Sequence, residues 1–342
     1  MPPHTPRRLP ATALATMVAL VTTTFLTSCS DDGETLTIYS GRTENLVGPI
    51  LENFTEETGI DVEVRYGQSA DLALLIEQEG DRSPADVFLS QSPGAIGFLA
   101  QDDRLAPLPP ATLELVDESV RSAAGTWVGM SGRIRTLVYN TDLVDPATLP
   151  TSVLDLTGEQ YHGQVALAPA NGSFQDFVTA LRETHGDEVA SEWLTGMAAN
   201  DAPVYADNTA IVQAVARGEV PMGLVNHYYN FRAKAENPSQ PTENYFFPDG
   251  DIGSLLLATA IGVLDSSDDI ELADQLVSFM LGEHAQTFFS EETFEYPLAA
   301  GVQPAGGLPP MSDIQFATFD VDSLGGGLQR TLELIEESGL DG

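Results

Sequence analysis

Short runs of apolar residues alternate with segments of helical periodicity from residue 36 onward. Strands are expected at residues 36–39, 62–66 and 85–89, where β-branched and aromatic residues cluster. Between them, residues 44–58 and 70–79 have apolar side chains three and four positions apart, as one face of a helix requires. This opening predicts a β-α-β-α-β unit whose polar turns follow the strand ends, the edge at which open α/β sheets bind ligands.

The middle and end of the chain predict a second set of elements. Strands are expected at 165–168, 221–225 and 255–263, and at 126–128 and 134–139 on either side of a turn at 129–133. Helices are expected at 174–185, 189–197, 210–217, 271–281, 283–290 and 331–337. The strand at 255–263 is continuously apolar, as a buried strand that crosses between two lobes would be. We therefore expect two α/β lobes with a ligand cleft between them.

The N-terminal stretch predicts export. Residues 11–26 are mostly apolar and uncharged, follow Arg7 and Arg8, and fall short of the roughly 20 residues that a membrane-spanning helix needs. Cys29 comes three residues later and is the only cysteine, so it cannot form a disulfide within its own fold. A run of small residues that ends in Cys resembles the bacterial lipobox, which implies a lipid anchor on Cys29 after cleavage. A plain secretory signal is the alternative.

Acidic residues dominate the charge balance, with a formal net charge of −37. Cleavage would remove Arg7 and Arg8 but no acid, which takes the mature chain from −37 to −39. Nucleic acid is therefore excluded as a partner, because its phosphates would be repelled. The acids are spread along the chain, which is typical of the soluble surface of a protein from a salt-tolerant organism and indicates no particular ligand.

Sequence signatures of enzymes are missing. The chain has no Walker loop, GxSxG elbow, HExxH motif or paired cysteines. Its five histidines are scattered, and no carboxylate pair stands out by spacing among 51 Asp and Glu residues. A binding protein is favoured, with an extracytoplasmic hydrolase that uses a carboxylate pair as the alternative.

Tyr228 and Tyr229 form an adjacent pair where a predicted strand gives way to a helix. Neighbours on a straight strand point to opposite faces, so both side chains can meet one ligand only where the strand breaks. Two phenolates are hard oxygen donors that suit a hard trivalent cation. A free phenol titrates near pH ~10, so a metal would have to displace its proton. The alternative is one buried and one surface tyrosine with no shared ligand.

Five short blocks resemble a known family when taken together. They are LTIYSGR at 36–42, SPADVF at 83–88, SGRIR at 131–135, NGSFQ at 171–175 and NHYY at 226–229. In this order they resemble the ferric-iron-binding periplasmic proteins of ABC importers, the bacterial transferrins. The resemblance extends from about residue 36 to about residue 297.

The resemblance implies a ligand set. It implies that Tyr228 and Tyr229 ligate Fe³⁺, and that a synergistic anion such as carbonate binds at the turn formed by Asn171, Gly172 and Ser173. Free backbone N–H groups at a helix N-terminus attract anions, which agrees with that turn. Further candidates are Arg42 and Arg133 as partners of the anion, and Asn226 and Asn208 as residues that orient the ligands.

Several positions depart from the family pattern. Thr43 and Glu44 stand where some members have a His or Tyr ligand, and Gln91 stands where some have Glu. Asn171 occupies the position of a Tyr found in other members. Two protein ligands therefore remain, with Glu44 and Gln91 as possible additions, and anions or water would complete the coordination of the iron.

The sequence as a whole predicts a type II periplasmic-binding-protein fold. Expected parts are a signal peptide at 1–28, a tether at 29–35, an N-terminal lobe at 36–134 plus 259–309, and a C-terminal lobe at 135–258 plus 310–342. We expect a monomer, anchored through Cys29 on the extracytoplasmic face of the cell membrane, that delivers Fe³⁺ to an ABC permease. The same fold could instead bind thiamine, a polyamine or a phosphonate, with Tyr228 and Tyr229 stacking on it.

Overall fold

The computed structural model describes residues 34–299, 301–317 and 327–340. The expected signal peptide and Cys29 lie outside the described residues. No helix in the described part is long and apolar enough to cross a membrane. The strands are β1 (Thr35–Ser40), β2 (Asp61–Tyr66), β3 (Val87–Ser90), β4 (Trp127–Asn140), β5 (Val165–Ala166), β6 (Met222–Asn226), β7 (Thr242–Tyr245), β8 (Leu256–Val263) and β9 (Tyr296–Pro297). The helices are α1 (Glu44–Thr58), α2 (Ser69–Glu79), α3 (Pro93–Gln101), α4 (Pro110–Leu113), α5 (Gly172–His185), α6 (Asp187–Ala199), α7 (Asn208–Ala216), α8 (His227–Glu236), α9 (Ile270–Met280), α10 (Glu283–Glu292) and α11 (Leu328–Ser338).

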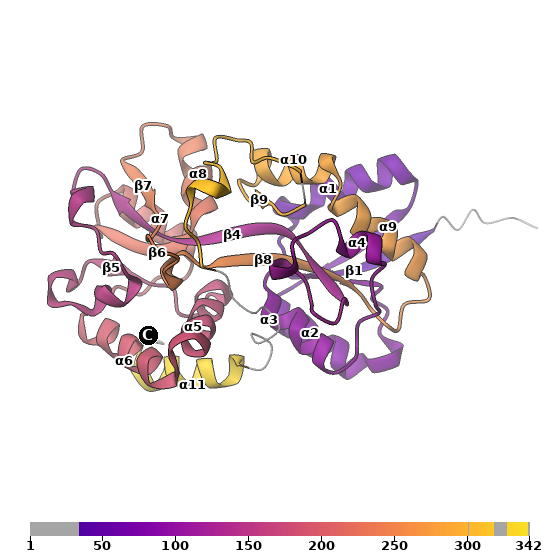
Figure 1. The fold of residues 1–342 in the computed structure, drawn as a ribbon, viewed down its shortest axis with the longest axis horizontal. Coiled ribbons are helices and arrows are strands. Elements are labelled where there is room, and N and C mark those ends of the chain that lie inside the picture. Colours follow the sequence, from indigo (N-terminus) through magenta and orange to yellow (C-terminus); the bar gives the residue numbers. More distant parts are fainter. Residues whose placement is uncertain (1–33, 300, 318–326, 341–342) are drawn as a thin grey trace, which may run out of the picture. The chain divides into compact units, whose positions relative to one another are not determined.

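The strands join in the order β2-β1-β3-β8-β4-β6-β5, with β7 and β9 also paired to β4. β1 lies between β2 and β3 and runs parallel to both, as the β-α-β-α-β pattern predicted. β8 returns antiparallel between β3 and β4. The first half of β4 pairs with β8 and β9, and its second half pairs with β6 and β7. Figure 1 shows β4 and β8 running side by side across the middle of the fold.

Buried apolar residues form separate cores on either side of this crossing. Val128 and Met130 of β4 belong to the core built on β1–β3, α1, α9 and α10, whereas Leu137 of the same strand belongs to the core built on α5, α6 and α11. We call the first group, with α2, α3, α4 and β9, the N-terminal lobe, and the second, with β5–β7, α7 and α8, the C-terminal lobe (Figure 1). The predicted two-lobed α/β fold is confirmed.

The turn predicted at residues 129–133 is wrong, because these residues lie inside β4. A register shift between Gly129 and Ser131 is the one irregularity there. A Cβ on Gly129 would lie 2.9 Å from the Ala258 Cβ and 2.9 Å from the Val120 carbonyl, so this glycine permits close packing against neighbouring chain segments. Arg133 consequently projects from the middle of a buried strand and not from a solvated turn.

Candidate metal and anion site

The loops that follow β1, β2 and β3 meet at one edge of the sheet, as expected for parallel strands. Gly41 N donates to the Leu89 carbonyl at 2.7 Å, and Gln91 N donates to Ser69 Oγ at 2.9 Å. A Cβ on Gly41 would lie 1.9 Å from Ser69 Oγ, so only glycine fits this approach. The packing of these loops fixes where Arg42 leaves the backbone.

Arg42 is only 4% exposed and forms an ion pair with Glu295, which follows α10. The other carboxylate oxygen of Glu295 accepts a hydrogen bond from Ser131 of β4. The guanidinium carbon of Arg42 lies 5.9 Å from the centre of the Tyr228 ring. Burial opposes the charge on Arg42, but Glu295 and both tyrosines outweigh it and raise the net pKa of Arg42. Arg42 is therefore a fixed positive charge beside Tyr228.

Tyr228 and Tyr229 lie in the first turn of α8, immediately after β6 ends at Asn226. The break between strand and helix brings both rings to one side, where they stack with centroids 4.1 Å apart and planes 28° apart. Tyr228 is 1% exposed, and Tyr229 is half-buried. Burial, and then the neighbouring Tyr229, raises the pKa of Tyr228 well above its usual value of 10. This phenol keeps its proton at neutral pH unless a cation displaces it.

The turn before α5 is tied to the tyrosine segment. The Asn171 side chain accepts from Ser173 N at 3.1 Å and from Asn208 Nδ2 at 3.2 Å. Asn226 Nδ2 donates to Ser173 Oγ at 3.0 Å, and Asn226 Oδ1 accepts from Arg135 at 3.3 Å. The start of α5 and Asn226, two residues before Tyr228, thus belong to one hydrogen-bonded network.

Arg133 is completely buried, yet none of its three guanidinium nitrogens has a hydrogen-bond partner among the described residues. Burial, together with the nearby Arg42, lowers its pKa. A buried charge without a partner is costly, so such a group is retained where acceptor atoms reach it. This donor set fits an anion that binds next to Arg42 and Arg133.

A cavity of about 470 Å³ opens beside the turn before α5. Asn171, Gly172 and Asp176 of the C-terminal lobe line it together with Gln91 and Ser92 of the N-terminal lobe. A separate cavity of about 220 Å³ adjoins Tyr229 on another side. Space for small molecules therefore lies beside the turn before α5 and, separately, beside Tyr229.

Comparison with known proteins identifies the family. Residues 82–324 match the bacterial extracellular solute-binding proteins. The chain belongs to this family. A Fe(3+)-binding periplasmic protein of Serratia marcescens is 33% identical over 308 residues, which cover 89% of this chain and 90% of the relative.

Solved structures of solute-binding proteins agree with this assignment. Iron-bound HitA from Pseudomonas aeruginosa has a TM-score of 0.85 and 34% identity, and the match covers 90% of this chain and 99% of HitA. The Trichodesmium protein IdiA (FutA), in complex with iron and citrate, has a TM-score of 0.79 and 28% identity over 89% of this chain and 99% of that one.

The remaining sequence-predicted residues lie less centrally in this solute-binding protein. Glu44 is exposed in the first turn of α1, and Gln91 lines the 470 Å³ cavity, which neither tyrosine lines. Among the described residues, no group of three or more His, Cys, Asp and Glu side chains is arranged to hold a metal. Any metal here would depend on the tyrosines.

Sequence reasoning missed Glu295 and Asp176. Glu295 lies in an irregular segment and is one acid among 51, so only its pairing with Arg42 distinguishes it. Asp176 occupies one position on the polar side of a predicted helix, and only the structure shows that it is buried. No local sequence pattern identifies either residue.

Proposed function

We propose that this solute-binding protein captures Fe³⁺ together with a small oxyanion and delivers it to the permease of an ABC importer. One observation carries the proposal: the stacked rings of Tyr228 and Tyr229 lie at the end of a buried strand, beside the buried cations Arg42 and Arg133. Phenolates are hard donors for a trivalent cation. The Serratia relative and HitA, both described as iron-binding, support the same ligand.

The coordination shell that we propose contains the two tyrosine oxygens and the anion. Glu44 or Gln91 would add a ligand only if the loops after β1 or β3 moved toward the tyrosines. Asn226 and Asn208 would orient the site through Ser173 and Asn171. Domain boundaries at 134/135 in β4 and 258/259 in β8 would place the hinge for closure in these two crossing strands.

The anion would lie between the α5 N-terminus and Arg133. Arg42 already has Glu295 as its counter-charge, whereas Arg133 has none within hydrogen-bonding distance in the described chain. Carbonate meets this requirement, and a polycarboxylate such as the citrate bound by the Trichodesmium protein meets it too. A net anionic group beside Arg133 would offset the buried positive charge.

The proposal also includes location and mode of action. Cleavage before Cys29 and lipidation of that residue would hold a monomeric binding protein on the extracytoplasmic face of the cell membrane, next to its permease. The protein would act without catalysis, because capture and release of an ion require no covalent step. Mass analysis of the protein purified from membranes tests the anchor, since an unmodified N-terminus at Cys29 or at any other residue contradicts it.

Addition of a ferric salt with hydrogencarbonate to the purified protein tests the iron site. The wild type should develop a visible phenolate-to-iron absorption band, and Tyr228→Phe and Tyr229→Phe should each lose most of it. Tyr161→Phe is a matched control, because Tyr161 packs at the edge of the C-terminal core. An unchanged spectrum of the wild type on addition of iron refutes the proposal.

A further inference from the structure

Asp176 is a buried acidic group near the anion turn that, like the buried arginines, has unmet hydrogen-bonding capacity. Its side chain is 7% exposed, and its Oδ2 atom has no partner in the described part of the protein. Its carboxylate interacts electrostatically with Arg133, yet no ion pair forms between them. An unpartnered acceptor and an unpartnered donor group therefore lie near each other without touching.

The position of Asp176 directs it toward the same ligand. It lies one turn into α5, beyond Gly172, and both residues line the 470 Å³ cavity. Ser92, which precedes α3 in the opposite lobe, lies near enough to oppose the rise in the pKa of this carboxylate, and it lines the same cavity. The other charged groups around it are Arg133 and Arg135 of β4, with Asp71 and Asp207 lining the same cavity.

A molecule held by both Arg133 and Asp176 must accept hydrogen bonds on one side and donate one on the other. Arg133 offers only donors, and the backbone N–H groups at the start of α5 are donors too. A carboxylate offers only acceptors, and it repels an oxyanion oxygen that has no proton. Hydrogenphosphate and hydrogencarbonate supply both charged oxygens and an O–H group, whereas sulfate at neutral pH supplies no O–H.

We propose that Asp176 makes this site selective for oxyanions that retain a proton, with the anion's O–H donating to Asp176 Oδ2 and its charged oxygens accepting from Arg133. The inference deepens the proposed function, since this oxyanion is the one that would accompany the iron. Asp176 is thus a specificity-determining residue of the anion site.

Titration of the carboxylate sets the pH range of the selectivity. Burial raises the pKa of Asp176 to about 6, with Arg133, Ser92 and Arg135 opposing that rise. Above pH 6 the group is ionised and accepts the anion's proton; below it, the protonated acid can donate to sulfate. Discrimination should therefore be strong at pH 7.5 and fade toward pH 5.

Anion titrations of the iron-free protein test the inference, with inorganic phosphate and sulfate as probes and tryptophan fluorescence as readout. At pH 7.5 the wild type should bind phosphate at least about tenfold more tightly than sulfate, the ratio expected for one charge-assisted hydrogen bond. In Asp176→Asn the amide can donate to sulfate, so the ratio should approach one. Asp71→Asn removes the same charge from an exposed position on the cavity wall and should keep the wild-type ratio.

The other outcomes are equally decisive. If Asp176→Asn changes the affinity for phosphate and for sulfate by the same factor, the inference is wrong, and the carboxylate only holds a water molecule or contacts Ser92. If Ser92→Ala keeps the wild-type ratio of phosphate to sulfate affinity, the contact with Ser92 is excluded as the explanation. A wild type that binds neither anion also overturns it. Selective anion binding without a ferric absorption band would instead refute the iron proposal and leave the role of Asp176 intact.

Discussion

Arg42 and Glu295 form a buried ion pair across 253 positions of sequence. The pair joins the loop after the first strand to the segment after α10, and Ser131 of β4 donates to the same carboxylate. Glu295 thereby holds Arg42 next to Tyr228 and offsets one of the two positive charges there. Glu295 thus acts on the tyrosine site through Arg42, its ion-pair partner.

Glu295→Gln should destabilise the ligand-free protein by about 3 kcal/mol, because removal of one partner leaves a buried charge uncompensated. Arg42 and Arg133 would then both lack a counter-charge, so added phosphate should stabilise this variant more than the wild type. Urea unfolding followed by tryptophan fluorescence measures both effects, since Trp127 and Trp193 lie in the cores of different lobes.

Glu243→Gln provides the control for this substitution. Glu243 pairs with Lys234 but is half exposed, so loss of that pair should cost less than about 1 kcal/mol. Equal destabilisation of the two variants would contradict a special role for the buried pair.

Iron binding should weaken steeply as the pH falls. The pKa of Tyr228 lies above its usual value of 10, so its proton is present in the iron-free protein at neutral pH and must leave when the metal binds. The release of two phenol protons predicts a fall in apparent affinity of about 100-fold for each pH unit below neutrality. The affinity for iron falls as the pH falls because protons and iron compete for the same phenol oxygens.

Calorimetry in buffers of different ionisation enthalpy counts these protons directly. The wild type should release at least two protons per iron at pH 7, and Tyr229→Phe should release one fewer. A proton count of zero would show that the phenols do not ligate the metal.

Arg133→Met should stabilise the iron-free protein while abolishing its response to anions. The guanidinium of Arg133 has no partner in the described chain to offset its burial, so an apolar side chain of similar length should raise the free energy of unfolding by about 1–2 kcal/mol. Phosphate should then no longer increase stability in urea unfolding. A loss of stability in this variant would indicate that Arg133 already has a compensating partner in solution.

The local part of the site was predictable from sequence because it depends on chain breaks. The break between strand and helix drew attention to Tyr228 and Tyr229, and the family resemblance named Arg42 and Asn171; the structure places Arg42 after β1, Asn171 at the start of α5 and the tyrosines in the first turn of α8. The same reasoning failed for residues 129–133. Glycines often mark turns, but Gly129 lies inside β4 and permits close packing there.

The long-range part was not predictable, since it depends on contacts that no local pattern encodes. Glu295 meets Arg42 only through the return of the chain after α10, and Asp176 becomes buried only when α5 packs beside α3 of the other lobe.

Helix α3 was also missed, because its two glycines and the initial Pro93 resemble a loop, although proline is well tolerated in the first turn.

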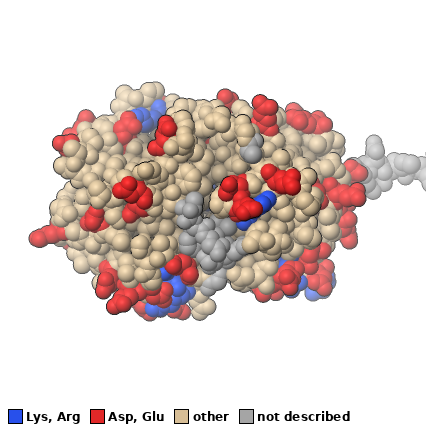
Figure 2. All heavy atoms as spheres, viewed as in Figure 1, with Lys and Arg blue, Asp and Glu red and all other residues tan. Residues whose placement is uncertain are grey.

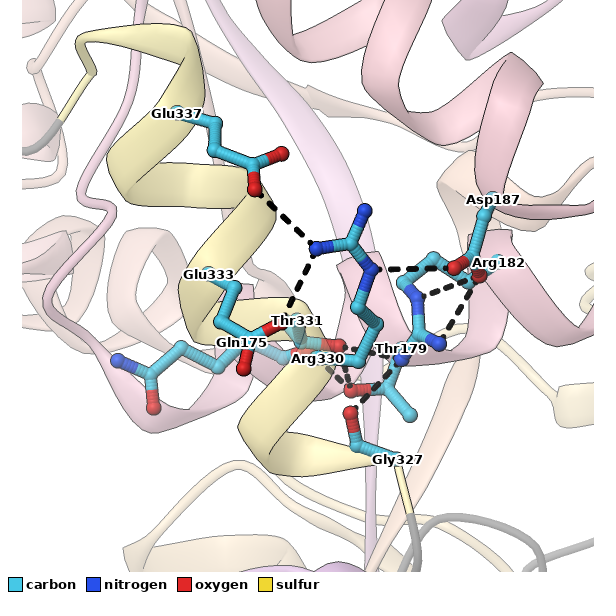
Figure 3. Close-up of polar contacts among 9 residues, drawn as sticks. All are labelled: Gln175, Thr179, Arg182, Asp187, Gly327, Arg330, Thr331, Glu333 and Glu337. Carbon is cyan, nitrogen blue, oxygen red and sulfur yellow. Dashed lines mark hydrogen bonds and ion pairs between the residues drawn. The ribbon is translucent and has the colours of Figure 1, made fainter.

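Arg182 attaches the last described helix to the lobe that contains the anion turn. It donates to Asp187 at the start of α6, to the Gly327 carbonyl at 2.7 Å and to Thr331 of α11 at 3.1 Å (Figure 3). Thr331 also hydrogen-bonds to Thr179 of α5 at 2.7 Å. On the face shown in Figure 2, acidic side chains are scattered over both lobes. Arg182, by contrast, is a buried cation that joins α5, α6 and α11.

Arg182→Met should therefore cost about 2 kcal/mol, since it leaves the Gly327 carbonyl and the Thr331 hydroxyl short of a donor. It should also raise hydrogen exchange throughout α11 while exchange in β4 remains slow, because α11 contacts the core through few residues besides Leu334 and Ile335. Arg330→Met is the matched control: Arg330 bonds to the same Asp187 from an exposed position, so its loss should change stability by less than about 1 kcal/mol. Uniform loss of protection in both lobes would show that Arg182 supports the whole fold and not the attachment of α11. Arg182→Met should lower the free energy of unfolding and Arg133→Met should raise it, because the first buried arginine has partners and the second lacks its anion.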